Sequence, residues 1–325
     1  MPFLMTPLAL LIERYFGYPE KLTAVIGHPV MWFGRLIDIL EQRTNRPERS
    51  AAARRLAGIV SLSALLGITL VVTVLIQQVL RAVPFGWVLE ALLATPLLAQ
   101  KELGRAVRAV ADALQGSLAA GREAVSHIVG RDPQALDEAG VARAAIETLA
   151  ESTSDGVVAP LFWLALFGLP GIALYKAINT ADSMIGHLNG RYRDYGWAAA
   201  KLDDAVNWIP ARLTAVLITA ACFVTPHASP SAAWAAARRD ARKHASPNAG
   251  WPEAAFAGAL GFKLGGPRSY NGDIVDLPAF GSGKTTLVGS DIRRALQLYF
   301  ACLNVLLSVS IAVTLMLTFS SIQAS

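Results

Sequence analysis

The sequence contains few charged residues for its length. Asp, Glu, Lys and Arg make up 16% of its 325 residues, whereas soluble domains carry about 25%. A large soluble core could raise the hydrophobic fraction, which is 54% here, but it would not remove so many charges. The shortage of charge therefore argues against a soluble protein and favours an integral membrane protein.

Cysteine is also scarce, and aromatic residues are missing from the basic segments. Cys222 and Cys302 lie in apolar segments and form neither a CxxC pair nor a zinc-type spacing, so we expect buried thiols. The net charge is +5, yet no aromatic side chains interleave with the basic runs as a nucleic-acid surface requires. We therefore expect no nucleic-acid partner.

Two long uncharged segments predict membrane-spanning helices. Residues 56–80 and 295–319 each run 25 residues without a charge. A helix of that length is ~37 Å long, enough to cross a hydrocarbon core of ~30 Å. Weaker spans are predicted at residues 3–16, 85–99, 157–175 and 209–225. The N-terminal stretch lacks a basic region and a cleavage site, so we expect a retained helix rather than a signal peptide.

These spans predict an all-α integral membrane protein: one membrane domain, 1–325, with a bundle of about five to six transmembrane or re-entrant helices and amphipathic cytoplasmic helices. Basic residues flank residues 56–99 at 43–55 and after 100, which places 43–55 and 101–155 in the cytoplasm. Gly168-Leu169-Pro170 interrupts the span at 157–175. That break allows two half-helices that line a cavity open to the cytoplasm.

Three polar segments separate the spans: 101–156, 176–208 and 227–294. Residues 101–129 predict one amphipathic helix, because Leu103, Val107 and Val110 fall on one stripe. Asp137 is then expected to cap a second helix that runs to about Ser152. The segment 227–294 is rich in loops, which usually carry function on a rigid scaffold.

The first candidate site lies in "ETLAESTSDG", residues 147–156. Glu147, Glu151 and Asp155 are spaced four residues apart and share one helix face. Like charges on one face repel one another, and hard oxygen ligands suit Mg²⁺. The alternative is a solvated acidic face. Because the three acids directly precede an apolar segment, we favour a metal site.

The second candidate site is "NTADSMIGH", residues 179–187. Asn179 and Asp182 share a helix face, and polar oxygens beside an apolar helix are costly without partners. The alternative is a capped turn in which Asp182 starts a helix, with His187 as a structural hydrogen-bonding residue.

The third candidate site is "LDDAVNWIPAR", residues 202–212. Asp203, Asp204, Asn207 and Arg212 span about two helical turns. Pro210 fits the first turn of a following helix. The Arg212 side chain would either extend to the interface or bind a phosphate, which a planar guanidinium suits.

The fourth candidate site is the basic segment before the turn "SPNAGWP". Positive side chains stand at Arg238, Arg239, Arg242, Lys243 and His244. They would neutralise phosphate oxygens, and backbone N–H groups of a glycine-containing turn can approach an anion. Positive-inside loop charge accounts for the basic residues but not for the turn beside them.

The string "GSGKTT" at 281–286 resembles the end of a phosphate-binding loop. In the pattern G-x-x-x-x-G-K-[ST], the first glycine falls at position 278, which is Pro278. Proline has no N–H and a fixed φ, and no β-branched strand precedes the string. We therefore expect a polar loop, with Lys284 as a surface lysine and at most a lid, and a following helix capped by Ser290.

Several long segments, in order, resemble the adenosylcobinamide-phosphate synthase family of cobalamin biosynthesis. They are "GHPVMWFGRLI" (27–37), "ARAAIETLAESTSDGVVAPLFW" (142–163), "YKAINTADSMIGH" (175–187), "LDDAVNWIPARLTA" (202–215), "RDARKHASPNAGWPEAAFAGALGFKLGGPRSY" (239–270) and "DIRRALQLY" (291–299). The chain departs from the family pattern at two places. Gly17-Tyr18-Pro19 stands for Gly-Asp-Pro, and Ser152 stands for Asn.

The resemblance implies an ATP-dependent ligase in the inner cell membrane, multi-pass, with its active site facing the cytoplasm. It would join the carboxylate of adenosylcobyric acid, a corrinoid, to (R)-1-amino-2-propanol or its O-phosphate, with ATP and Mg²⁺ as cofactors. Membrane lipid surrounds such a protein. A homo-oligomer and contacts with other membrane enzymes of cobalamin assembly are further candidate partners.

Residue roles follow from the resemblance together with the four candidate sites. Catalytic candidates are Glu147, Asp182, His28 and His244. Metal candidates are Glu147, Glu151 and Asp155. Candidates for binding substrate or phosphate are Arg212, Arg239, Arg242, Lys243, Asn179, Asn207, Asn248, Trp251 and Glu253.

Two other classes share the hydropathy. A transporter component for a corrinoid would also place Asn and Asp within the membrane, and corrinoid-dependent ATP consumption without a change of compartment would distinguish a ligase from it. A CDP-alcohol phosphotransferase is disfavoured. Pro160 stands where its signature after Asp155-Gly156 needs Arg, and the downstream acidic pattern is missing.

Overall fold

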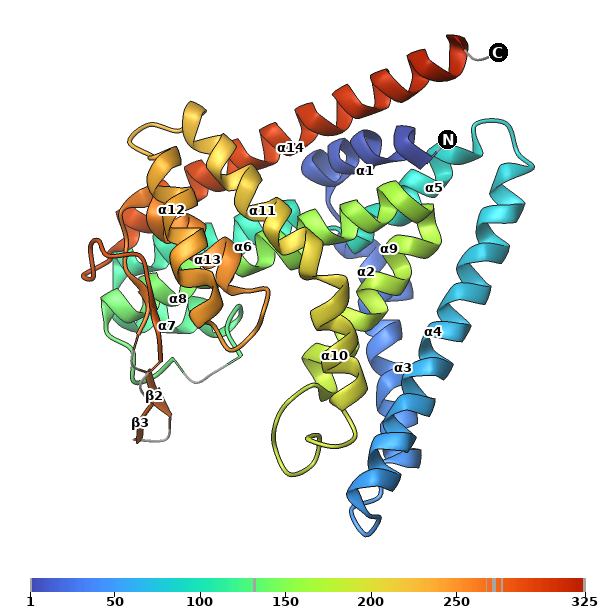
Figure 1. Cartoon of the computed structure of the whole chain (residues 1–325), viewed down its shortest axis with the longest axis horizontal. Coiled ribbons are helices and arrows are strands. Elements are labelled where there is room, and N and C mark those ends of the chain that lie inside the picture. Colours follow the sequence, from blue (N-terminus) through green and yellow to red (C-terminus); the bar gives the residue numbers. More distant parts are fainter. Residues whose placement is uncertain (1, 131–132, 267, 271–272, 276, 324–325) are drawn as a thin grey trace. The chain divides into compact units, whose positions relative to one another are not determined.

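A computed structural model describes residues 2–130, 133–266, 268–270, 273–275 and 277–323. The chain divides into two compact units. Unit 1 comprises Met1–Ala99, Ala159–Asn207 and Ser310–Ser325, and unit 2 comprises Gln100–Val158 and Trp208–Val309. The element order, coloured along the sequence in Figure 1, shows that each unit is assembled from distant parts of the chain.

Unit 1 is built from helices. In order they are α1 (Pro2–Phe16), α2 (Glu20–Ile26), α3 (Pro29–Thr44), α4 (Ala51–Arg81), α5 (Gly86–Ala94), the 3₁₀ turn η1 (Thr95–Leu97), α9 (Ala159–Ile185) and α10 (Trp197–Val206). The last part of α14, from Ser310, also belongs to unit 1.

Unit 2 combines helices with two small hairpins. Its helices are α6 (Gln100–Gly116), α7 (Leu118–Ser126), α8 (Glu138–Thr153), the π turn η2 (Ser154–Val158), α11 (Trp208–Ala221), η3 (Cys222–Val224), α12 (Pro230–Asp240), η4 (Ala241–Lys243), α13 (Gly250–Leu260) and most of α14 (Gly289–Gln323). Its strands are β1 (Leu264–Gly265), β2 (Arg268–Tyr270), β3 (Asp273–Val275) and β4 (Ala279–Phe280). β1 pairs with β4 and β2 with β3, both antiparallel.

Among the described residues, three helices are long and apolar enough to cross a membrane: α4, the continuous helix Glu138–Ile185, and Gly289–Ser320. The pair α10 and α11, bent by 43°, would make a fourth span. The predicted helical, multi-pass membrane architecture is confirmed, including the long spans at 56–80 and 295–319, and the two short hairpins are the only strands among the described residues. The predicted spans at 3–16 and 85–99 correspond to α1 and α5, which have 15 and 9 residues and are shorter than the ~20 residues of a full span.

The core of unit 1 lies where α3, α4, α9 and α10 pack together. Leu62 and Leu65 of α4 pack with Ala177 and Ala181 of α9 and with Tyr195. Gly58 permits this packing, because a Cβ there would lie 1.8 Å from the Tyr195 carbonyl oxygen. A glycine in a helix is costly, and here it allows close approach of two backbones.

The predicted break in α9 is present. Gly168 has φ 68° and ψ −150°, which is outside the helical region, and Pro170 follows it. The left-handed φ suits glycine, which has no Cβ to clash. Lys176, Asn179 and Asp182 lie in α9 after the kink.

The core of unit 2 is a tight packing of α11, α12 and α13. Small residues dominate α13, and Ala254, Ala255 and Ala257 are fully buried. A Cβ at Gly258 would lie 2.3 Å from the Ala232 carbonyl oxygen on α12. Small residues thus allow the close helix contacts that are typical of membrane proteins.

Two predictions about local structure in unit 2 have different outcomes. Asp137 caps α8, and its Oδ1 accepts the backbone N–H of Gly140 at 2.7 Å. The single helix predicted over 101–129 is wrong, because the chain forms α6 and α7 instead. Ser117 ends the first helix and caps the second, accepting the backbone N–H of Ala120. The predicted apolar stripe holds in α6, where Leu103, Val107 and Val110 are buried.

The "GSGKTT" string is a loop whose Lys284 contacts the end of α13 and the start of α14. The Lys284 backbone bonds to Gly261 and Lys263, and its Nζ lies 2.6 Å from Oδ2 of the buried Asp291. Lys284 is exposed at the surface, as predicted, and its ammonium also pairs with a buried carboxylate. The predicted Ser290 cap is wrong: α14 already begins at Gly289, and Asp291 accepts the backbone N–H of Val288. Cys222 and Cys302 are buried free thiols, as predicted.

Candidate functional site

Unit 2 contains a polar pocket of about 410 Å³ whose lining includes three glutamates and a histidine. We call it the acidic pocket. Its lining residues are Ile128, Val129, Gly130, Ala144, Glu147, Thr148, Glu151, Ser152, His244 and Glu253. Like charges gathered in one pocket favour a cation, because their mutual repulsion must be offset.

The α8 helix supplies the first wall of the acidic pocket. Glu147 and Glu151 are one turn apart, so both side chains face the same side of the helix. Glu147 is buried, and its Oε1 accepts the backbone N–H of Gly265 at 2.7 Å. Glu151 is exposed. One carboxylate is thus fixed by β1, and the other stands at the open side of the pocket.

Asp155 does not line the acidic pocket. It lies in the π turn η2, which follows α8 directly. A π turn holds more residues than an α turn, so it rotates the following side chains off the stripe that α-helical spacing predicts. The spacing of four residues would place Asp155 beside Glu147 and Glu151 in a regular α-helix. The π turn interrupts that regularity, so Asp155 does not join them.

His244 and Glu253, from the segment after α12 and from α13, also line the acidic pocket. The His244 Nε2 lies 3.6 Å from Glu253 Oε1. The backbone N–H of Ser246 lies 2.9 Å from His244 Nδ1, and the Ser246 carbonyl oxygen lies 3.3 Å from the same nitrogen. Both ring nitrogens of His244 therefore face protein groups.

The turn before α13 places Glu253. Ser246 Oγ accepts the backbone N–H groups of Asn248 and Ala249, at 3.2 and 3.3 Å. Gly250 then allows close approach, because a Cβ there would lie 2.2 Å from the Ala241 carbonyl oxygen. Glu253 sits in the first turn of α13, where the positive end of the helix dipole stabilises a carboxylate.

Arg212 binds the same turn from α11. Its Nη1 donates to the Trp208 carbonyl oxygen at 2.7 Å and to Asn248 Oδ1 at 3.2 Å. The guanidinium carbon lies 4.2 Å from the centre of the Trp208 ring and 4.9 Å from that of Trp251. Two indole faces stabilise this cation, so the structure joins three predicted residues: Arg212, Asn248 and Trp251.

The basic segment is organised by a buried aspartate. Arg239 Nη2 and Lys243 Nζ each lie 2.6 Å from an Asp240 carboxylate oxygen, and the backbone N–H of Gly281 donates to it at 2.9 Å. Burial opposes ionisation of Asp240, but these hydrogen bonds outweigh it and hold the pKa of this carboxyl well below its usual range. Arg239 and Lys243 remain about half exposed.

Unit 1 holds a separate set of polar residues, which we call the α9–α10 network. Tyr175 donates to Asn207 Oδ1 at 2.9 Å, and Asn207 Nδ2 donates to Asp203 Oδ2 at 3.0 Å. Asn179 links Asp203 to Lys176, each contact measuring 3.4 Å. The network joins residues of two predicted sites, 179–187 and 202–212.

Asp182 lies near this network and interacts electrostatically with Asp203, Asp204 and His187. It is inside α9, close to its end. The interpretation of Asp182 as the start of a helix is therefore wrong, because α9 continues through "NTADSMI" to Ile185.

His28 is the N-cap residue of α3 in unit 1. Its Nδ1 accepts the backbone N–H of Val30 at 3.3 Å, and its ring meets the Tyr18 ring edge to face at 4.8 Å. Burial and the nearby charge of Lys176 lower the pKa of His28. Tyr18 thus packs on this histidine.

The predicted residues fall into two groups. Unit 2 holds Glu147, Glu151, Asp155, Arg212, Arg239, Arg242, Lys243, His244, Asn248, Trp251 and Glu253, and unit 1 holds His28, Asn179, Asp182 and Asn207. The sequence interpretation missed Asp240 as the partner of the basic segment. The signal was present, because Asp240 directly follows Arg239 and precedes Lys243 by three residues.

The predicted Mg²⁺ site combines Glu147, Glu151 and Asp155. Among the described residues, no group of three or more His, Cys, Asp or Glu side chains is arranged to hold a metal ion. Mg²⁺ retains several waters and is usually bound by one or two carboxylates plus substrate phosphates. Glu147 and Glu151 both line the acidic pocket.

Comparison with known proteins identifies close relatives over nearly the whole chain. The family described as CobD/Cbib protein matches residues 6–299. A cobalamin biosynthesis protein CobD of Brucella anthropi is 48% identical over 95% of both chains. Proteins with the same name from a Sinorhizobium species and from Rhodobacter capsulatus are 45% and 48% identical; the alignments cover 96% and 91% of this chain and 98% and 92% of theirs. No solved structure matches the chain.

Proposed function

Since this chain belongs to the CobD/CbiB family, we propose that it catalyses an ATP-dependent amide ligation in cobalamin biosynthesis. The substrates are adenosylcobyric acid and (R)-1-amino-2-propanol or its O-phosphate, and the product is adenosylcobinamide or its phosphate. Family membership and the acidic pocket support this proposal. The acidic pocket is the observation that most directly supports the proposed chemistry.

The reaction determines what the site must supply. Amide formation from a free carboxylate is unfavourable in water, so ATP must activate the carboxylate. In the proposed route, a carboxylate oxygen attacks the γ-phosphorus and displaces ADP. The amine then attacks the acyl carbon, and inorganic phosphate leaves. This route needs positive charge around the phosphates, a base for the substrate ammonium and precise placement of the reactants.

In the acidic pocket, Glu147 and Glu151 are the proposed Mg²⁺ ligands. When bound there, Mg²⁺ would supply positive charge that offsets the charge of the phosphates. Glu147 is held by Gly265, so its carboxylate is already oriented. Asp155 lies on the π turn, outside the pocket lining, and the proposal does not require it as a ligand.

Glu253 is the proposed base for the substrate ammonium. It is buried in the acidic pocket, and His244 faces it through Nε2. A carboxylate that takes the proton converts the ammonium into the nucleophilic amine. His244, first considered for acid–base chemistry, acts here as a positioning residue. Asp182 of unit 1 is the rival candidate for the base.

Cations of the same unit are proposed to receive the phosphates and the corrin. Arg239 and Lys243 hold Asp240 and keep half of their surface exposed, and Arg242 is exposed beside them. The Arg212–Trp251 stack is a flat surface against which a planar macrocycle can pack. Asn248 fixes that stack through its bond to Arg212.

A direct test uses purified protein with adenosylcobyric acid, ATP, Mg²⁺ and each amino alcohol, and measures the corrinoid product by mass. We expect an amide product and one ADP per product. With ¹⁸O in the substrate carboxylate, one label should appear in the released phosphate. Corrinoid-dependent ATP hydrolysis without an amide product would refute the ligase proposal and favour the transporter alternative.

The active site is proposed to face the cytoplasm, where ATP is available. Gly190 lies in an exposed part of unit 1, between α9 and α10, and a Cβ there meets no atom within 4 Å. Because both native cysteines are buried, Gly190→Cys gives a selective label. We expect an impermeant maleimide to label it in inverted vesicles and not in intact spheroplasts. The reverse pattern would place this segment outside.

A further inference from the structure

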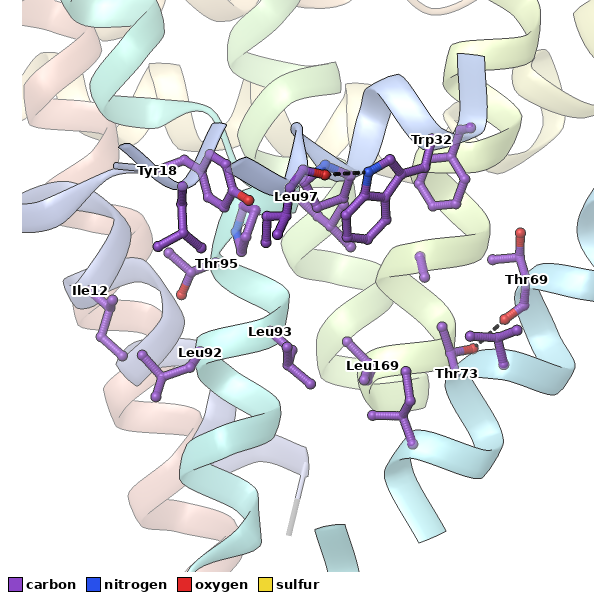
Figure 2. Close-up of a pocket in the computed structure, with 18 of the residues that line it drawn as sticks. Ile12, Tyr18, Trp32, Thr69, Thr73, Leu92, Leu93, Thr95, Leu97 and Leu169 are labelled. Atoms are coloured by element: carbon purple, nitrogen blue, oxygen red, sulfur yellow. Dashed lines mark hydrogen bonds between the residues drawn. The ribbon is translucent and has the colours of Figure 1, made fainter. Parts of the chain in front are cut away.

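Unit 1 contains a second pocket, of about 810 Å³, that the proposed reaction does not use. We call it the apolar pocket. Helices α1 to α5 and α9 contribute side chains to it, and Figure 2 shows Tyr18, Trp32 and Leu97 at one end with Leu92, Leu93 and Leu169 further along. Its volume is within the range of about 300–1,000 Å³ that small-molecule sites occupy.

The hydroxyl groups in the wall of the apolar pocket are satisfied within their own helices. Thr69 donates to the Leu65 carbonyl oxygen, Thr73 to that of Thr69, and Thr95 to that of Ala91. A corrinoid with a rim of amide groups would find few partners here, because buried amides must be hydrogen-bonded. The wall therefore suits an alkyl chain.

The apolar pocket adjoins exposed apolar surface on a helix that is long enough to span a membrane. The α4 span provides Ile68, Val72 and Ile76 to its wall, each at least one-third exposed. On the other side, Phe16 and Ile26 line the pocket and are 73% and 49% exposed. Such exposed apolar residues are stable in lipid rather than in water.

One end of the apolar pocket is amphipathic. Tyr18 and Trp32 line it there, and these residue types are enriched at membrane–water interfaces. On α9, Lys176 follows the wall residues Leu169 and Ala173 at spacings of seven and three, so it continues their face. Lys176 also lies near His28, whose ring contacts Tyr18. A cation thus stands beyond the aromatic end of the alkyl-lined wall.

We infer that the apolar pocket binds one acyl chain of an anionic membrane phospholipid, whose phosphate lies toward Lys176. The occupant matches each feature of the pocket: an alkyl chain for the wall, a glycerol region beside the aromatic residues, and a negative headgroup for the cation.

Quenching of Trp32 fluorescence by phosphatidylglycerol with brominated acyl chains tests the inference on the full-length protein in detergent. We expect saturable quenching at one lipid per chain, and no such component in Trp32→Phe. Ala173→Phe fills the pocket and should weaken binding at least tenfold. Val71→Phe, on an exposed face of α4 outside the pocket lining, is the matched control and should bind as wild type does.

Lys176→Gln should abolish the preference for phosphatidylglycerol over phosphatidylcholine, and inorganic phosphate should not displace the lipid. Equal quenching in Ala173→Phe and wild type would overturn the inference. Competitive displacement of the lipid by adenosylcobyric acid would also overturn the inference, because a corrinoid would then occupy the pocket. Loss of quenching when the protein dimerises would overturn it too, because a second copy would then occupy the pocket. If Ala173→Phe loses helical content by circular dichroism, Thr73→Phe at the half-exposed wall position replaces it.

Discussion

The two polar regions of this protein differ in how their carboxylates are used. In the α9–α10 network of unit 1, Asp203 accepts hydrogen bonds from Asn179 and Asn207, and Tyr175 extends the chain. In the acidic pocket of unit 2, Glu147, Glu151 and Glu253 line one cavity with His244. Amide and phenol partners make the network a means of joining helices, whereas the acidic pocket gathers negative charge where a ligand can enter.

We propose that the chemistry lies in unit 2 and that the α9–α10 network joins helices in unit 1. Substitutions in the two regions are expected to have different effects, which decrease from the acidic pocket to the α9–α10 network.

We expect the largest fall in the rate of amide formation when the proposed base is removed. Glu253→Gln should lower kcat by about 10²-fold or more, the usual contribution of general base catalysis. Raising the pH should restore part of the rate, because the substrate amine is then already deprotonated. The measurement is a pH–rate profile of amide formation.

Asp182→Asn is the matched control in unit 1, and we expect less than about tenfold loss, with an unchanged profile. A larger loss in Asp182→Asn than in Glu253→Gln, with alkaline recovery, would move the base to unit 1 and reverse the comparison.

An intermediate effect is expected at Asp240. Asp240→Ala removes the partner of Arg239, Lys243 and the Gly281 N–H, so we expect a loss of about 1–3 kcal/mol in the free energy of unfolding. Because the native pKa of Asp240 is lowered, its stabilisation is present above its unfolded value of about 3.9 and is lost as the pH falls below it.

Thermal unfolding as a function of pH measures this difference between Asp240→Ala and wild type. Asp112→Ala removes a surface ion pair with Arg293 and should cost less than about 1 kcal/mol. Equal costs for the two variants would show that Asp240 is not the anchor of the basic segment.

The smallest effect is expected in the α9–α10 network. Tyr175→Phe removes one hydrogen bond to the buried Asn207, so unfolding should become easier by about 1 kcal/mol. The rate of amide formation should stay within about twofold, since the network is assigned to helix pairing. A large drop in kcat at unchanged stability would bring this network into the active site.

The sequence was informative where local rules decide the structure. Asp137 as a cap, the break at Gly168 and the long spans at 56–80 and 295–319 follow from side-chain hydrogen bonding, backbone freedom and hydrophobic length. The family resemblance rested on long motifs, and the comparisons confirm it.

Features that depend on distant residues were not predictable from one sequence. The π turn at 154–158 shifts Asp155 away from the stripe that regular spacing gives. Nothing local in the sequence indicates that His244 and Glu253 line the same pocket as Glu147. Asp240 stands among basic residues that resemble loop charge, and only the fold brings the Gly281 N–H to it.

The assignment of the chemistry to the acidic pocket is tested most directly by the double variant Glu147→Gln/Glu151→Gln at saturating Mg²⁺ and ATP. The measurement is the rate at which the corrinoid amide, identified by its mass, is formed. Both substitutions preserve side-chain volume, so helical content should be unchanged. The assignment to the acidic pocket predicts amide product from wild type and on the order of 10²-fold less from the double variant. Product formation at the wild-type rate by the double variant would contradict it.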